Sequence, residues 1–112
     1  MIPKKLGRVK LEKWVNGLHP DLQWAITTAS RLKTSIDFIY DSQGPGVSVN
    51  GEKRAVSRSD LKFFECRLRR YDFVETPSRI FFEFGEILFF FLTERGHRFA
   101  RFVERWSERP RY

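Results

Sequence analysis

Residues 87–96 join an apolar run to a polar corner. Ile-Leu-Phe-Phe-Phe-Leu occupies residues 87–92, and Thr-Glu-Arg-Gly follows it directly. A short run of large apolar residues bounded by turn signals is typical of a strand buried on both faces, and this run is far too short to span a bilayer. Thr93 is a good N-cap residue. The stretch therefore predicts a core strand followed by a helix that begins at the corner.

The expected C-terminal helix covers residues 93–108 and has two faces. At helical spacing, apolar residues fall on one arc and arginines on the neighbouring one. The apolar arc consists of Phe99, Phe102, Val103 and Trp106, and the basic arc consists of Arg98, Arg101, Arg105 and Arg109. This helix is expected to pack on the same core as the strand and to show its arginines to solvent.

A second amphipathic helix is expected over residues 57–71, before a phenylalanine-rich hairpin. Ser57 followed by Asp60 resembles a capping box at its start. Its apolar face consists of Leu61, Phe64, Leu68 and Tyr71, and its mostly basic opposite face consists of Arg58, Ser59, Lys62, Phe63, Cys66, Arg69 and Arg70. Residues 73–92 have the composition of strands with turns between them, which predicts an antiparallel β-hairpin.

The N-terminal half is expected to be mainly helical. Residues 1–18 form a basic extension with a short helix, and a long amphipathic helix covers residues 20–42, with proline and aspartate in its first turn. Trp24 and Phe38 lie on the outer face of this long helix, where they either form a second interface or are covered by the N-terminal helix. Residues 47–51 are expected to form a short strand that ends in an Asn-Gly turn.

The composition limits the class of protein. With 112 residues the chain has the size of a single domain, residues 1–112, and can form a core without disulfides or a structural metal. Cys66 is the only cysteine, and neither it nor the two histidines form a cluster with metal-ligand spacing. We therefore expect no cofactor and no metal. A lone cysteine and the lack of an apolar leader favour the cytoplasm.

The net charge of +7 lies in three blocks. Residues 53–71 carry seven Lys/Arg against two acidic residues, a net charge of +5, while residues 1–18 carry +4 and residues 94–112 carry +3. The segments between them are acidic, at −2 for residues 19–52 and −3 for residues 72–93. Basic blocks of this kind favour a polyanion as partner, although they can also simply keep a protein in solution.

The order of elements and the corner resemble a known family. The stretches LRRYDFVET and ILFFFLTERGHRFARFVER are similar to the second half of winged-helix transcriptional regulators of the multiple-antibiotic-resistance type or the related archaeal type. Leu68, Phe73-Val74 and residues 92–96 match the family pattern, and the resemblance covers residues 57–106. It implies an α+β fold, the winged helix-turn-helix, with helices around a small antiparallel β-hairpin wing and with added N-terminal and C-terminal helices.

By this resemblance, residues 59–71 form a recognition helix that lies in the major groove of duplex DNA. The chain would then be a homodimeric transcriptional regulator, because such proteins commonly dimerise through terminal helices. The residues implied to contact DNA are Lys53, Arg54, Arg58, Ser59, Lys62, Phe63, Cys66, Arg69, Arg70 and Arg79. The residues expected at the dimer interface are Trp24, Phe38, Phe99, Phe102 and Trp106.

Two features depart from the family pattern and keep other hypotheses open. Residues 51–56 are too few for the helix that usually precedes a recognition helix, and the wing has Arg79 as its one cation. An acidic, aromatic wing suits protein contact, so an interaction adaptor that uses the wing with Trp24 and Phe38 is a second hypothesis. RNA or single-strand binding through exposed phenylalanines is a third. We expect no enzyme, because no paired carboxylates, glycine-rich phosphate loop or Ser/His/Asp set is present.

Overall fold

Four helices and five strands make up the computed structural model of the chain, which describes residues 7–108 apart from the side chain of Val9. The helices are α1 (Arg8–Asn16), α2 (Pro20–Leu32), α3 (Arg58–Arg70) and α4 (Glu94–Glu108). The strands are β1 (Ile36–Asp41), β2 (Gly44–Val49), β3 (Glu52–Ala55), β4 (Ser78–Phe82) and β5 (Gly85–Phe90). The α+β class predicted from the sequence is confirmed. Arg109 and the first six residues of the expected N-terminal extension lie outside the described residues.

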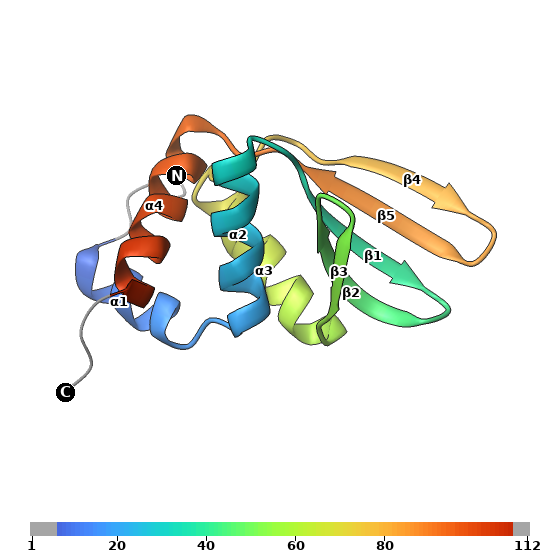
Figure 1. The fold of residues 1–112 in the computed structure, drawn as a ribbon, viewed down its shortest axis with the longest axis horizontal. Helices are drawn as coiled ribbons and strands as arrows, with labels where there is room; N and C mark the ends of the chain where they lie inside the picture. The colour runs from blue at the N-terminus through green and yellow to red at the C-terminus, as the bar shows by residue number, and fades with distance from the viewer. Residues whose placement is uncertain (1–6, 109–112) are drawn as a thin grey trace.

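The five strands form one antiparallel sheet in the order β3-β2-β1-β5-β4. The helices gather on one side of the sheet, and the β4–β5 hairpin projects away from them (Figure 1). Along β1, the side chains of Ile36, Phe38 and Tyr40 are buried and alternate with half-buried residues. Side chains that alternate along a strand point to opposite faces. One face of the sheet therefore carries the core, and the other face is the outer face.

The predicted long helix over residues 20–42 is wrong in its second half. Helix α2 ends at Leu32, and Lys33 after it takes a left-handed conformation with a φ of 54°. Strand β1 begins at Ile36. Apolar residues of this segment fit both a helical and an alternating pattern, so periodicity alone does not decide between them. Pairing with other strands decides for the strand, because β1 lies between β2 and β5 in the centre of the sheet. Its β-branched and aromatic residues also suit a strand.

The phenylalanine-rich region is pleated, as the sequence predicts, but it belongs to a larger sheet. Strands β4 and β5 form a hairpin, and β5 also pairs with β1, so that Ile87 lies beside both Ile80 and Ile39. Gly85 allows this contact, because a Cβ at that position would lie 1.9 Å from the backbone oxygen of Tyr40. The Asn50-Gly51 turn between β2 and β3 is also confirmed: both residues have positive φ, 51° and 87°.

The Thr-Glu-Arg-Gly corner holds the start of α4 against the residues that follow α3. The hydroxyl of Thr93 accepts a hydrogen bond from the Gly96 amide at 3.0 Å and donates one to the backbone oxygen of Asp72 at 2.6 Å. A Cβ at position 96 would lie 1.9 Å from the backbone oxygen of Phe73, so glycine is required for this approach. The corner therefore has a packing role, and the predicted N-cap is confirmed.

Aromatic rings fill the core. Two of them, Phe38 and Phe99, were expected at a dimer interface, and that expectation is wrong. Phe99 stacks on Trp14 and Phe73, with ring centroids 4.8 and 4.5 Å apart. Phe38 packs on Phe90 at 4.7 Å and has no exposed surface. Phe38 and Phe99 are thus core residues of a single chain and are not available to a dimer interface. Phe38 was expected on the outer face of a helix and lies instead on the core face of β1, whereas Phe99 lies in the core, where its apolar arc was expected to pack.

The segment between α2 and α3 differs from a helix-turn-helix. Strands β1, β2 and β3 occupy residues 36–55, so a three-stranded meander stands where a helix before the recognition helix would be. Val56 is buried and links β3 to the N-cap of α3. The place of α3 in the fold is therefore set by the sheet, on which it packs through β2.

Candidate nucleic-acid interface

Helix α3 is an amphipathic helix whose apolar side is anchored in the core. The hydroxyl of Ser57 caps it by accepting a hydrogen bond from the Asp60 amide at 3.2 Å. Leu61, Phe64 and Leu68 are fully buried beneath it. Its other side is exposed and carries most of the cations of the central basic block, as predicted. Because the buried leucines fix the rotation of the helix, they also fix where those cations lie.

A groove of about 620 Å³ runs between α3 and α1. Four cationic side chains line it, two from each helix, together with three aromatic rings. The lining residues are Lys10, Lys13, Trp14, Gly17, Phe63, Arg67, Arg70 and Tyr71. We call this feature the basic groove. It includes Phe63 and Arg70, which the sequence implied to contact DNA.

The basic groove has no carboxylate among the described residues that line it. The nearest acidic residues along the two helices are already paired with other arginines. Glu12 pairs with Arg8 at 3.1 Å, and Glu65 lies 3.5 Å from Arg69. No ion pair joins Lys10, Lys13, Arg67 or Arg70 to an acidic residue in the described part of the chain. Four unpaired positive charges around one cavity produce a positive potential that attracts anions.

Two aromatic rings give the basic groove a flat, apolar component. The Phe63 side chain is 53% exposed, and the Arg67 guanidinium lies 4.7 Å from its ring centroid. Trp14 lies at the bottom of the groove, buried, and its indole N–H has no hydrogen-bond partner among the described residues. A ring beside a guanidinium can stack on a nucleobase while the cation contacts phosphate.

The N-terminal turn of α3 rests on Tyr40 of β1. The guanidinium of Arg58 lies 4.8 Å and the ammonium of Lys62 lies 5.4 Å from the centroid of the Tyr40 ring. The tyrosine hydroxyl is buried and has no hydrogen-bond partner among the described residues. Burial, with a smaller contribution from the nearby Glu65 carboxylate, raises the pKa of Tyr40 to about 12. Tyr40 thus fixes two exposed cations of α3 from below.

Stability is expected to fall in alkali because of Tyr40. The folded chain holds the phenol proton up to about pH 12, whereas the unfolded chain releases it near pH 10.0. The stabilisation is therefore complete below pH 10.0 and is lost as the pH rises towards 12, by roughly 2 kcal/mol. Urea unfolding of the natural chain and of Tyr40→Phe between pH 10 and pH 12 measures this loss of unfolding free energy. The prediction fails if both chains lose the same stability.

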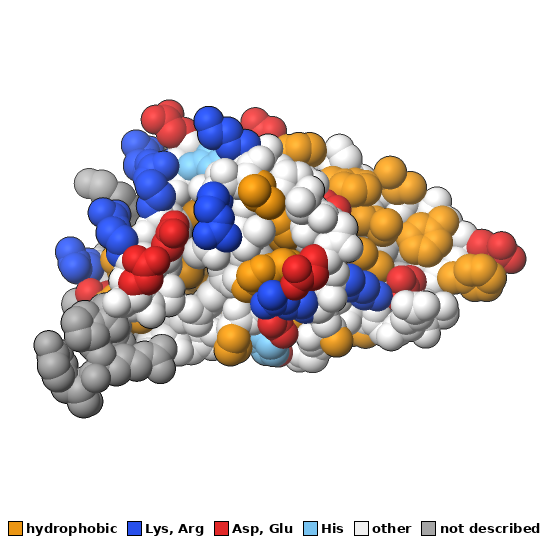
Figure 2. Space-filling view, in the orientation of Figure 1, with side chains coloured by type: hydrophobic (Ala, Val, Ile, Leu, Met, Phe, Trp, Pro, Cys, Tyr) orange, Lys and Arg blue, Asp and Glu red, His pale blue; other side chains and the backbone are white. Residues whose placement is uncertain are grey.

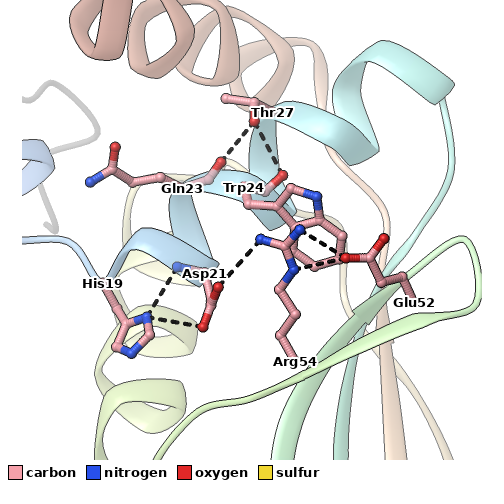
Figure 3. Close-up of polar contacts among 7 residues, drawn as sticks. All are labelled: His19, Asp21, Gln23, Trp24, Thr27, Glu52 and Arg54. Atoms are coloured by element: carbon pink, nitrogen blue, oxygen red, sulfur yellow. Dashed lines mark hydrogen bonds and ion pairs between the residues drawn. The ribbon is translucent and has the colours of Figure 1, made fainter.

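Lys53 and Arg54, implied by the resemblance to contact DNA, have partners within the chain. The Lys53 ammonium pairs with Asp41 at 3.3 Å. The Arg54 guanidinium lies 3.7 Å from the ring centroid of Trp24 and pairs with Asp21 and Glu52, at 3.3 and 2.8 Å (Figure 3). These contacts tie β3 to the start of α2. Both cations are partly neutralised, and Trp24, expected at a dimer interface, is half-covered by Arg54.

Of the other residues implied to contact DNA, three lie on α3 and one lies on the hairpin. Ser59 and Cys66 are exposed on α3, as is Arg69 beside Glu65. Arg79 is the second residue of β4, opposite Leu88, and pairs with Glu86 at 3.3 Å. The exposed side of α3 thus brings together seven of the ten residues: Arg58, Ser59, Lys62, Phe63, Cys66, Arg69 and Arg70. Lys53, Arg54 and Arg79 lie elsewhere.

Four residues of the basic groove were missed in the sequence: Lys10, Lys13, Trp14 and Arg67. Helical spacing carried a signal for them, because Lys10, Lys13 and Trp14 share one face of α1. By the same spacing, Arg67 shares a face of α3 with Phe63 and Arg70. The sequence could not show that these two faces meet across a groove.

The C-terminal half of α4 keeps two residues of the expected dimer interface. Phe102 and Trp106 are half-buried and stack on each other with ring centroids 6.1 Å apart. With Arg8 and Arg105 they line a smaller cavity of about 420 Å³. Their part in a dimer stays a prediction.

Two further kinds of site are absent from the part of the chain that the structure describes. Within residues 7–108, no helix combines the length and the apolar character needed to cross a bilayer. In the same range, no group of three or more His, Cys, Asp or Glu is arranged to hold a metal ion.

The likeness to winged-helix regulators rests on the sequence pattern around the Thr93 corner. The meander before α3 and the five-stranded sheet differ from the small hairpin wing that this resemblance implies, so the structure shows the α+β class and not the winged helix-turn-helix. No protein-family model, no curated protein and no solved structure matches this chain.

Proposed function

We propose that the chain binds nucleic acid, with duplex DNA as its ligand, through the exposed side of α3 and the basic groove. The observation that carries the proposal is the set of four cations without a facing carboxylate. Most hydrogen bonds in protein–DNA complexes go to phosphates, and lysine and arginine make many of them. Each cation that meets a phosphate releases a counterion, so affinity is expected to fall steeply with salt.

Duplex DNA is favoured because the basic side belongs to a helix. An α-helix fits the major groove, where arginine and lysine read guanine edges. Arg58, Ser59 and Lys62 occupy the N-terminal half of α3 and would meet base edges. Arg67 and Arg70, nearer its C-terminal end, would hold the phosphate backbone together with α1. This division of roles follows the winged-helix pattern, and a role in transcription is proposed on that resemblance.

Single-stranded nucleic acid is a second candidate, supported by one residue. Phe63 is 53% exposed beside Arg67, and a ring in that position can stack on an unpaired base. The exposed phenylalanines of the hairpin do not support this candidate equally. Phe81 and Phe84 are 71% and 65% exposed, but the single nearby cation, Arg79, already pairs with Glu86.

The test compares three ligands of equal length over a range of salt concentrations: random-sequence duplex DNA, single-stranded DNA and single-stranded RNA. We expect duplex DNA to bind most tightly. If the four groove cations each meet one phosphate, the log-log slope of duplex affinity against salt is about −3.6. A flat salt dependence for all three ligands would exclude the proposal.

Phe63→Ala separates the two candidates. In the duplex model the substitution leaves duplex affinity nearly unchanged, whereas in the single-strand model it lowers single-strand affinity about tenfold, as loss of one stacked base does. Phe84→Ala is the control, because it removes a ring of similar exposure, 65%, from the hairpin, away from the basic groove. If single strands bind best and Phe63→Ala weakens them, the second candidate replaces the first.

A further inference from the structure

The two edges of the sheet are protected to different degrees. Edge strand β3 has the sequence EKRA, with charged residues at three of its four positions. Edge strand β4 has the sequence SRIFF, and all five of its residues are exposed. Exposed edges carry unpaired backbone groups, and natural proteins protect them with charges, proline or bulges. Strand β3 has such protection, whereas β4 presents three consecutive large apolar residues.

An apolar surface continues from β4 across the outer face of the sheet. Ile80, Ile87 and Ile39 stand side by side on β4, β5 and β1. Phe82 and Phe89 share that face by strand alternation, and Ile80 is 52% exposed. Figure 2 shows hydrophobic side chains gathered over the hairpin, with acidic side chains at its tip. A patch of this kind on a basic protein marks an interaction site separate from the cationic surface.

We propose that β4 pairs with β4 of a second copy of this chain, antiparallel and centred on Ile80. Ile80 is the midpoint of the strand, so this register pairs all five residues. In it, Ile80 faces the partner's Ile80, and Ser78 faces the partner's Phe82. The isoleucine row of each copy then meets that of the other across a two-fold axis. The two five-stranded sheets become one sheet with a continuous apolar strip on its outer face.

The charges of β4 are compatible with this register. Arg79 faces the partner's Phe81, and no like charges stand opposite each other. The Arg79 guanidinium already lies 5.7 Å from its own Phe81 ring and pairs with Glu86 at 3.3 Å. Pairing adds a second ring on the other side of this cation, an arrangement that favours cation–π contact. By contrast, a nucleic acid would meet the acidic tip and a cation that is already neutralised.

The surface available is enough for a weak, specific dimer. An aromatic side chain buries about 150–250 Å². With exposed fractions between 41% and 71%, Ile80, Phe81, Phe82 and Phe84 offer roughly 400 Å² per copy. Paired backbone raises the total for two copies to about 1,000 Å², in the range of weak and transient interfaces. The expected contact is an isologous one, since the same strand forms both sides.

Directed cross-linking tests the register in the full chain. In a Cys66→Ser background, Ile80→Cys places two thiols opposite each other, at a separation that a disulfide can close. Mild oxidation is expected to convert most of this variant into a covalent dimer. Ala55→Cys is the matched control, because it puts one exposed thiol on the other edge strand. Equal cross-linking of the two variants, or none, overturns the proposal.

Sedimentation equilibrium tests the dimer without cross-linking. The natural chain is expected to shift from monomer to dimer as its concentration rises through the micromolar range. Ile80→Glu, which places two carboxylates opposite each other, is expected to raise the dissociation constant about tenfold or more, with an unchanged circular dichroism spectrum. A chain that stays monomeric overturns the proposal, and so does a dimer that Ile80→Glu leaves intact.

Discussion

Replacing Phe99 with alanine is expected to lower the free energy of unfolding by about 4 kcal/mol. The ring packs against both Trp14 and Phe73, nearly parallel to each, and is almost completely buried. Its removal leaves a cavity that the stacked rings cannot fill without moving α1 or the residues after α3. Urea unfolding followed by tryptophan fluorescence measures the loss.

Phe102→Ala is the control for this prediction. It removes the same side chain from the same helix, but Phe102 is only half-buried at the edge of the core. Its loss is expected to cost about 1 kcal/mol, in proportion to the smaller area withdrawn from water. If Phe99 belonged to a dimer interface instead of the core, the two variants would unfold alike and would differ in association.

The elements that the sequence predicted well are those with local signals. Ser57 and Thr93 cap α3 and α4 with hydrogen bonds to amides three residues further on. Asn50-Gly51 makes the tight turn between β2 and β3. These contacts involve near neighbours in the chain, and the residue types reveal them without knowledge of the rest of the fold.

The segment after Leu32 shows what local signals leave open. Its residues fit an amphipathic helix by periodicity, yet β1 is the central strand of the sheet. Whether this segment forms a helix or a strand depends on its pairing with β5, which lies some fifty residues further along the chain, with Phe38 beside Leu88. Such non-local pairing contributes no pattern within the segment itself. For the same reason the sequence predicts a two-stranded wing, whereas the structure has a five-stranded sheet.

The candidate site was predictable only in part, for a related reason. The basic face of α3 follows from its helical period, but the charge of Lys53 and Arg54 says nothing about their partners. Asp21, which pairs with Arg54, lies thirty-three positions earlier. The number of cations can be read from the sequence. Whether a cation is free to bind a ligand depends on which carboxylates the fold places beside it. The basic groove stands out because its cations remain unpaired.

The triple substitution Lys13→Ala/Arg67→Ala/Arg70→Ala is expected to weaken duplex DNA binding about a hundredfold at physiological salt. Three of the four groove cations are removed, one from α1 and two from α3. If each meets a phosphate, the log-log slope against salt becomes shallower by about three. These long side chains are not buried in the core, so the melting temperature should change little. Fluorescence anisotropy over a salt series measures both quantities.

Arg98→Ala/Arg101→Ala/Arg105→Ala is the matched control, because it removes the same charge from α4. All three arginines are exposed, and α4 packs against α2 and α1. If a general attraction of a basic protein to DNA caused the binding, both triple variants would lose the same affinity and the same slope. If the basic groove holds the backbone, the α4 variant keeps nearly all of its slope. If only the α4 variant loses affinity for duplex DNA, the nucleic-acid interface lies on α4 and the basic groove is excluded as the binding site.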